Sequence, residues 1–209
     1  MTQLIIQANT LSLYDLQKKF GLQMVKDESF FPEWMEGLPS VTDSEAQALD
    51  RVKECYLHLN QRSILLEDLV KMVVLSRLLD LAGFYLPPFE IATEYSVELA
   101  VKNRDEVLKG RLDVLVLQSQ LWVLAIESKQ TKFDVTLAIP QALSYMLMSP
   151  PITNPVFGAV TNGREFIFIK LDKTEPPHYA LSDAFALSNR RNELYDVLAV
   201  LKKLGALII

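Results

Sequence analysis

Cysteine and histidine are scarce in this chain of 209 residues, which has one cysteine, Cys55, and two histidines. A single cysteine excludes an intramolecular disulfide and is typical of a reducing compartment, so we expect a cytoplasmic protein. Cys55 and His58 have the spacing of two zinc ligands, but no second pair follows them. The sequence therefore predicts no Cys/His zinc site, and both residues are expected on a helix surface or in the core.

Long hydrophobic runs and glycine-rich loops are also missing. No apolar segment is long enough to span a bilayer, and the polar start "MTQLIIQANT" is unlike a signal peptide, so no membrane partner is expected. The ATP-binding pattern G-x-x-x-x-G-K-[ST] is absent, as is the G-x-S-x-G of many hydrolases. Another type of hydrolase or a nucleotide-binding protein is therefore a weaker hypothesis, and no nucleoside triphosphate is expected as a partner.

Positive charge is in deficit, with a formal net charge of −5 and a pI near 5.1. This balance argues against strong non-specific binding of nucleic acid. It does not exclude an enzyme that meets a phosphate group through metal ions. Half of the residues are hydrophobic, which is enough for one large core and predicts a single compact domain.

Helix signals dominate the first part of the chain. Residues 1–40 are expected to be irregular or short-helical, and "TDSE" at 42–45 is a capping box that begins a helix through residue 60. A strongly apolar helix over 65–85 ends at Gly83 and the Pro87-Pro88 pair. We predict an N-terminal helical cap over residues 1–62, packed on a core over residues 63–209.

Strand signals follow. Residues 91–101 alternate polar and apolar side chains, which indicates a half-buried strand, and the apolar runs 111–117 and 121–128 are typical of central strands. Pro140 is expected in the first turn of the next helix, a hairpin over 154–172 turns at Asn162-Gly163, and a helix over 188–209 closes the chain. The predicted fold class is α/β or α+β, with one sheet flanked by helices.

Three charged residues lie at the ends of the two central strands. Asp113 begins the first, while Glu127 and Lys129, two residues apart, share a face at the end of the second. Antiparallel pairing around the short turn between the strands brings the two carboxylates together. Carboxylate oxygens with a backbone carbonyl suit Mg²⁺, and a neighbouring lysine can activate a water. The pattern therefore predicts metal-assisted phosphodiester hydrolysis.

This pattern resembles the PD-(D/E)xK nuclease superfamily, and within it the N-terminal nuclease domain of type I restriction enzyme R subunits. "GRLD" (110–113) and "ESK" (127–129) match its two core motifs in order and spacing, and "QALSY" resembles the Gln-x-x-x-Tyr motif of RecB-type nucleases. The chain departs from the pattern in having no proline before Asp113 and in having Pro140 just before Gln141. Without an ATP-binding loop, it looks like a stand-alone domain with no motor.

The resemblance implies a restriction-endonuclease-like core with a central mixed β-sheet and a Mg²⁺ cofactor, for which Mn²⁺ can substitute. It implies that the metal is held by Asp113, Glu127 and the Ser128 carbonyl, with Glu67, or its neighbour Asp68, as a further acid. Lys129 would activate the water. The implied catalytic set is Asp113, Glu127, Lys129, Gln141 and Tyr145.

Plainer interpretations stand beside these. Glu127 and Lys129 can form a structural salt bridge, Gln141 and Tyr145 can simply complete a core, and Glu67 can be an exposed first-turn acid. Four basic residues near the predicted site are best explained as a solvated loop, and they are also the residues we would choose for phosphate contacts: Lys102, Arg104, Lys109 and Arg111.

Two functional hypotheses result. The first is a Mg²⁺-dependent DNA endonuclease, for which cutting both strands favours a homodimer. The second is a catalytically inactive nuclease-fold protein that acts as a binding or assembly module, which the acidic pI favours.

Overall fold

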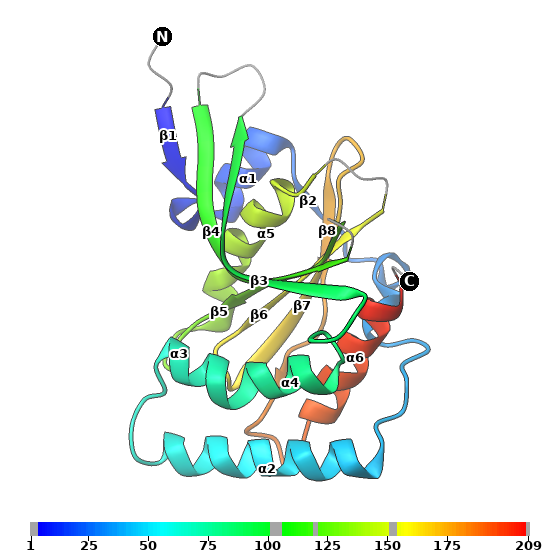
Figure 1. Cartoon of the computed structure of the whole chain (residues 1–209). Coiled ribbons are helices and arrows are strands. Elements are labelled where there is room, and N and C mark those ends of the chain that lie inside the picture. The colour runs from blue at the N-terminus through cyan, green and yellow to red at the C-terminus, as the bar shows by residue number, and fades with distance from the viewer. Residues whose placement is uncertain (1–3, 101–105, 119–120, 151–153, 208–209) are drawn as a thin grey trace.

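A mixed β-sheet forms the centre of the protein, seen in a computed structural model that describes residues 4–100, 106–118, 121–150 and 154–207 (Figure 1). Within these residues the sheet has nine strands in the order β1-β4-β5-β6-β7-β8-β2, and in addition β3 pairs with β4 and β9 with β7. The strands are β1 (Leu4–Gln7), β2 (Gln23–Met24), β3 (Phe89–Ala100), β4 (Glu106–Gln118), β5 (Leu121–Ser128), β6 (Val156–Thr161), β7 (Glu165–Asp172), β8 (His178–Leu181) and β9 (Phe185–Ala186).

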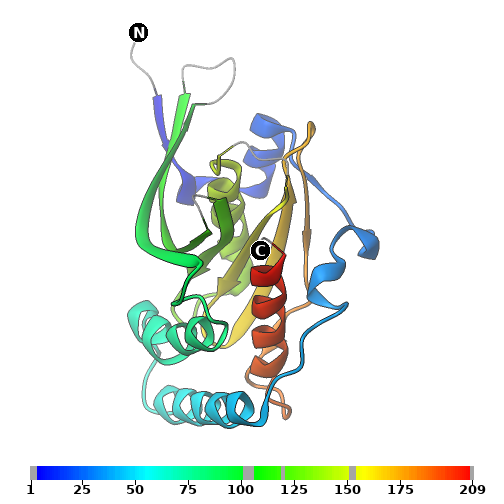
Figure 2. The same cartoon turned by 45° about the vertical axis from the view of Figure 1, so that its right-hand side comes forward.

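Helices cover both faces of this sheet, which confirms the predicted fold class (Figures 1 and 2). The α5 helix joins the parallel strands β5 and β6 and packs with α1 on one face, while α2, α4 and α6 pack on the other. The helices are α1 (Leu13–Phe20), α2 (Asp43–Asn60), α3 (Glu67–Val70), a π-helical segment η4 (Lys71–Leu75), α4 (Ser76–Leu81), α5 (Ile139–Leu147) and α6 (Leu194–Ala206), with short 3₁₀ turns at Ala8–Thr10, Glu28–Phe30, Pro32–Trp34 and Val135–Ala138.

Local sequence signals fix several helix and turn boundaries as predicted. The Thr42 side chain accepts a hydrogen bond from the Glu45 N–H while the Glu45 carboxylate accepts one from the Thr42 N–H, so α2 begins with a capping box. Pro140 lies in the first turn of α5, where its missing N–H costs nothing. Gly163 turns the β6–β7 hairpin with a φ of 78°, which a side chain would disfavour.

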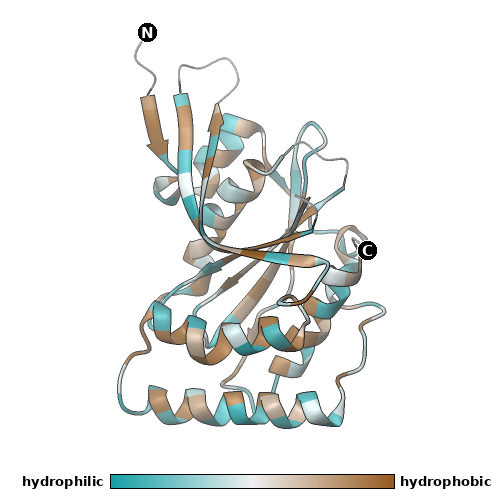
Figure 3. Ribbon diagram, in the orientation of Figure 1, coloured by the Kyte–Doolittle hydropathy of each residue, from teal (hydrophilic) through white to brown (hydrophobic). Residues whose placement is uncertain are grey.

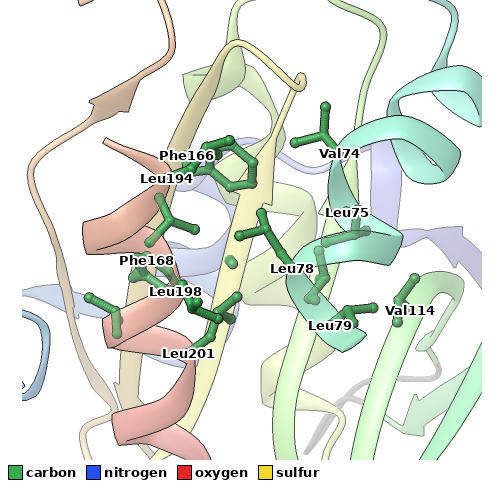
Figure 4. Close-up of a cluster of buried hydrophobic side chains, with 14 of the residues drawn as sticks. Val74, Leu75, Leu78, Leu79, Val114, Phe166, Phe168, Leu194, Leu198 and Leu201 are labelled. Carbon is green, nitrogen blue, oxygen red and sulfur yellow. The ribbon is translucent and has the colours of Figure 1, made fainter. Parts of the chain in front are cut away.

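Two hydrophobic cores hold the layers together, one on each face of the sheet. Side chains from α4, β7 and α6 meet in the larger core, where Leu78, Phe168 and Leu198 are completely buried (Figure 4). The other core lies under α5 and contains Leu16, Leu143 and Leu115. In Figure 3 the central strands are largely apolar, whereas the helices carry both polar and apolar residues.

The long strand β4 connects β1 and β3 to β5 and the strands that follow it in the sheet. It pairs with β3 from residue 107 to 118 on one edge, and on its other edge with β1 at its beginning and β5 at its end. β3 and β4, with β1 beside them, therefore extend past the other strands as a bent arm (Figure 1). The arm, the end of β5 and the beginning of α3 together surround the position of Asp113.

The N-terminal segment that was predicted as a helical cap also contributes strands to the sheet. The first 62 residues do supply the helices α1 and α2, but β1 pairs in parallel with β4 and β2 with β8, so this segment also forms part of the sheet. β1 and β2 are only four and two residues long, too short for alternation of side chains to reveal them. The boundary at residue 62 stays a prediction.

Two further features differ from the sequence-based expectation. The apolar helix over 65–85 is three segments, because the π-helical turn η4 separates α3 from α4. Two strands, β8 and β9, follow the β6–β7 hairpin where none was predicted. The prediction of central strands is confirmed, since β4 and β5 each pair with other strands on both edges. The two strands pair antiparallel with each other, with a bulge between Val116 and Leu117. None of the helices in the described ranges is long and apolar enough to cross a bilayer.

The core predicts that replacing a buried leucine by alanine lowers stability much more than replacing an exposed one. Leu78→Ala leaves a cavity where a fully buried side chain packed, so we expect a loss of about 2–5 kcal/mol in the free energy of unfolding. Leu57 on α2 is 42% exposed, and Leu57→Ala is expected to cost about 0.5 kcal/mol or less. Chemical denaturation of both variants measures the difference, and equal losses would contradict this description of the core.

Candidate active site

A cleft of about 690 Å³ opens between the β3–β4 arm, the end of β5 and the helices α3 and α5. Its walls carry the charged residues predicted at the strand ends together with residues from β1, α3, β3 and α5. The 3₁₀ turn after β1 also contributes Ala8 and Asn9, which the sequence analysis did not include. The functional side chains on the lining are Glu67, Glu94, Asp113, Glu127, Lys129, Gln141 and Tyr145.

The register of β4 and β5 brings Asp113 and Glu127 together. Val114 pairs with Ile126, so the next residues toward the cleft on the two strands are Asp113 and Glu127. The backbone N–H of Ser128 donates a 2.7 Å hydrogen bond to Oδ2 of Asp113. The Ser128 backbone therefore lies beside Asp113. The role of the Ser128 carbonyl as a metal ligand stays a prediction.

Glu127 is the most buried charged side chain of the cleft, with 1% of its surface exposed. One of its oxygens, Oε1, accepts a short hydrogen bond from Nζ of Lys129. The other, Oε2, is buried and has no hydrogen-bond partner among the described residues. Burial, and after it the charge of Asp113, raise the pKa of Glu127 to about 8 against the opposing effect of Lys129.

Lys71 is a cation of this site that the sequence analysis missed. Its Nζ lies 2.9 Å from Oε1 of Glu67 and 3.1 Å from Oδ1 of Asp113. Burial lowers the pKa of Lys71, but the hydrogen bonds and charges of Glu67 and Asp113 outweigh this effect and raise it above its usual range. The four-residue spacing of Glu67 and Lys71 on a predicted helix was the signal that could have found it.

Burial also raises the pKa of Asp113, although the Ser128 N–H and Lys71 oppose that shift. The two carboxylates thus share one cause for their raised pKa values. Both have lost hydration at the ends of buried strands, and each has gained one lysine in return.

Glu94 on β3 is a fourth acid of the site and was also missed. It has a φ of 53°, the single positive value that a residue other than glycine adopts in the described chain. A backbone of this kind costs about 1–3 kcal/mol and is found mostly at functional sites. Its carboxylate lies 2.8 Å from Nε of Arg111 and 3.8 Å from Nζ of Lys71.

The predicted basic residues are only partly described. Arg111 pairs with Glu94, and Lys109 pairs with Glu98 at 2.9 Å, and these four residues of the arm line the cleft. Lys102 and Arg104 lie outside the described residues. Contacts of these four residues with phosphate stay a prediction.

Gln141 and Tyr145 lie on one face of α5, as their spacing predicts. Nε2 of Gln141 donates a 2.8 Å hydrogen bond to the Tyr145 hydroxyl, and Pro140 does not disturb this face because it lies in the first turn of the helix. The Tyr145 ring packs so closely on Gly110 that any side chain there would overlap it. Burial and the charge of Glu127 raise the pKa of Tyr145.

The donor atoms fit a hard divalent ion. In the described part of the chain, no group of three or more Asp, Glu, His or Cys side chains has the geometry of a complete metal site. Mg²⁺ needs no such cage, because it is usually bound through one or two carboxylates and keeps several waters. Asp113 and the unpartnered Oε2 of Glu127 could supply these ligands at the edge of an open cleft.

Comparison with known proteins identifies the family of the chain. The family model described as type I restriction enzyme R protein N terminus matches residues 36–177, about two thirds of the chain. The chain belongs to this family. The matched range of this R protein N-terminal domain contains every residue of the predicted site, whereas β1 and the 3₁₀ turn that lines the cleft precede it.

Among solved structures, the domain is similar to a fragment of an HsdR subunit of a type I restriction enzyme from Vibrio vulnificus YJ016. The two chains are 20% identical with a TM-score of 0.40, and the match covers 68% of this chain and 26% of that one. The match thus spans about a quarter of the length of that solved chain. A search of curated protein sequences found no match.

The close contact between Gly110 and Tyr145 predicts that a side chain at position 110 displaces the Tyr145 ring and lowers stability. Gly110→Ala would place a methyl group inside the van der Waals radius of the Tyr145 ring, so the ring must move away from the cleft. We expect a loss of about 1–3 kcal/mol in stability, and Gly110→Ala/Tyr145→Ala should recover part of it because the overlap is removed. Thermal unfolding of the two variants and Tyr145→Ala measures this coupling, and strictly additive losses would contradict it.

The raised pKa of Glu127 predicts how stability depends on pH in the metal-free protein. Between the usual pKa of about 4.5 and the folded value of about 8, the unfolded chain is ionised at this residue while the folded chain holds the proton. Folding stability therefore falls as pH rises through this window, by about 1.4 kcal/mol for each pH unit at most. Glu127→Gln should remove this fall.

The test is chemical denaturation in EDTA at pH 5, 6.5 and 8. We expect wild type to lose stability relative to Glu127→Gln as pH rises. Parallel pH dependence of the two proteins would mean that Glu127 stays ionised in the folded state.

Proposed function

We propose that this domain hydrolyses phosphodiester bonds of DNA in a reaction that depends on Mg²⁺ or Mn²⁺. The observation that carries the proposal is the buried Glu127 carboxylate, with one oxygen free, beside Asp113 and in contact with Lys129 at an open cleft. A buried, unpartnered carboxylate oxygen is costly unless it has a ligand. Membership of the type I restriction enzyme R protein N-terminal family supports DNA as the substrate.

Asp113 and Glu127 would hold the metal, with the Ser128 carbonyl as a third ligand. When bound, such an ion polarises a phosphate oxygen and lowers the pKa of a bound water. Lys129 lies on the cleft beside Glu127, where its ammonium group can orient the attacking water and offset negative charge on the phosphate oxygens. Gln141 holds the Tyr145 hydroxyl on the opposite wall, so this pair supports the site from α5.

Lys109 and Arg111 are the proposed contacts for the DNA backbone. Their side chains are 42% and 67% exposed, and each is paired with a glutamate of β3. Exposed ion pairs are worth about 0–1 kcal/mol, so a phosphate can replace the glutamate at little cost. Because each copy has one such cleft, we propose that two copies act together when both strands are cut.

A second candidate is a nuclease fold that has lost catalysis and acts as a binding or assembly module. The observation that favours it is Lys71, whose ammonium group lies between Glu67 and Asp113 where a metal ion would otherwise be attracted. Titration with Mn²⁺ in the absence of DNA separates the two candidates, because the module requires no metal.

Cleavage assays test the proposed activity. Purified protein is incubated with supercoiled plasmid, linear duplex and single-stranded DNA in Mg²⁺, Mn²⁺ or EDTA. We expect metal-dependent cleavage that falls by about 10²–10⁴-fold in Lys129→Ala and in Asp113→Asn, because water activation and metal binding are lost. Lys18→Ala, an exposed lysine of α1 away from the cleft, is the matched control.

Wild-type rates in both site variants would contradict the assignment of Asp113 and Lys129. Absence of cleavage on every substrate, together with absence of Mn²⁺ binding, would favour the non-catalytic module.

A further inference from the structure

Lys71 is held by three acids beside the cleft, in a neighbouring pocket that shares Glu94 and Asp113 with it. Its Nζ lies 2.9 Å from Glu67, 3.1 Å from Asp113 and 3.8 Å from Glu94, and 20% of its side chain is exposed. A compact ammonium charge surrounded by carboxylate oxygens from α3, β3 and β4 occupies the kind of position that a hard metal ion prefers. Lys71 therefore acts as a cation of the site as well as a partner of one glutamate.

The backbone around Lys71 is unusual. Lys71 is the first residue of the π-helical segment η4, which interrupts the helix between α3 and α4. Single π-helical turns are rare and occur frequently at functional sites. The turn begins at Lys71, whose ammonium group reaches Asp113.

Asp113 has room for one more cation on the side of Glu127. Its Oδ1 accepts from Lys71 and its Oδ2 from the Ser128 N–H, but each carboxylate oxygen has two lone pairs. Oε2 of Glu127 is buried and has no hydrogen-bond partner among the described residues. A divalent ion can therefore bind between Asp113 and Glu127 without displacing Lys71.

The charge balance favours one divalent ion rather than two. When all four acids of the site are ionised, as metal binding to Glu127 requires, Glu67, Glu94, Asp113 and Glu127 face three bases, Lys71, Arg111 and Lys129, which leaves a net charge of −1 before the ion binds. One divalent ion turns this balance positive, and a second would meet repulsion from Lys71 as well as from the first ion. Without Lys71, the acids that surround it, Glu67, Glu94 and Asp113, would lose one compensating positive charge.

We infer that Lys71 is a tethered cation that takes the place of a divalent ion between Glu67 and Asp113, and so restricts this site to a single metal ion. The inference rests on the proposed function for the ion at Asp113 and Glu127, but it concerns the opposite side of Asp113. It assigns Lys71 as a positioning residue, because its ammonium group holds Glu67 and Asp113 in place without touching the reacting phosphate.

The experiment counts Mn²⁺ ions bound to the full chain in the absence of DNA, by equilibrium dialysis and by the loss of the free-ion electron paramagnetic resonance signal. Wild type is expected to bind one ion. Lys71→Met, which keeps the length of the side chain but removes its charge, is expected to bind one ion more than wild type. Lys71→Gln is measured beside it, so that one neutral variant is available if the other does not fold.

Two controls locate the additional ion. Glu67→Gln/Lys71→Met should return to the wild-type count, because the extra ion needs the Glu67 carboxylate. Lys170→Met removes a lysine that is 14% exposed and paired with Glu33 at 2.5 Å outside the cleft, so its ion count should equal that of wild type. Circular dichroism and thermal unfolding verify that each variant is folded.

The outcomes separate this inference from the proposed function. Equal counts in wild type and in the folded neutral variants, or two ions on wild type, would overturn the role of Lys71. No ion on wild type but one on Lys71→Met would support Lys71 as the tethered cation while overturning the proposed metal site at Asp113 and Glu127. One ion on wild type and two on the variant would support both.

Discussion

Two carboxylates that have lost most of their hydration, Asp113 and Glu127, are the constraint on which the site depends. Like charges at neighbouring positions of buried strands repel each other, and desolvation further disfavours their ionised forms. The structure compensates with one lysine for each acid and with the Ser128 N–H for Asp113. One oxygen of Glu127 stays without a partner, so the compensation is incomplete where a metal ion would bind.

The sheet explains how such a costly arrangement is maintained. β4 is paired on both edges and its two faces contribute to both hydrophobic cores, so Asp113 cannot withdraw from Glu127 without breaking the register. On one side, α3 and η4 bring Glu67 and Lys71, anchored by the buried Val70 and Val74. On the other side, α5 brings Tyr145 against Gly110. Each charged group is thus fixed by apolar packing around it rather than by its ion pairs alone.

Much of this arrangement could be predicted from local patterns. Thr42 and Pro140 mark helix starts because capping and the missing proline N–H act within one turn. Two apolar strands and a short turn predict that Asp113 and Glu127 lie close together, but the bulge between Val116 and Leu117 sets the register that brings Asp113 opposite Glu127. Gln141 and Tyr145 could be paired because four residues make about one helical turn. The family match is consistent with these motifs.

The sequence by itself determined the two central strands, the chemistry at their ends and the face of α5 that meets them, because those features follow from periods of two and 3.6 residues. Tertiary structure alone decided that β1 and β2 join the sheet and that Lys71 reaches Asp113. β1 and β2 are too short to carry a periodic signal, and Lys71 meets Asp113 across 42 residues of chain. Contacts of that range depend on how whole layers pack, which no local pattern contains.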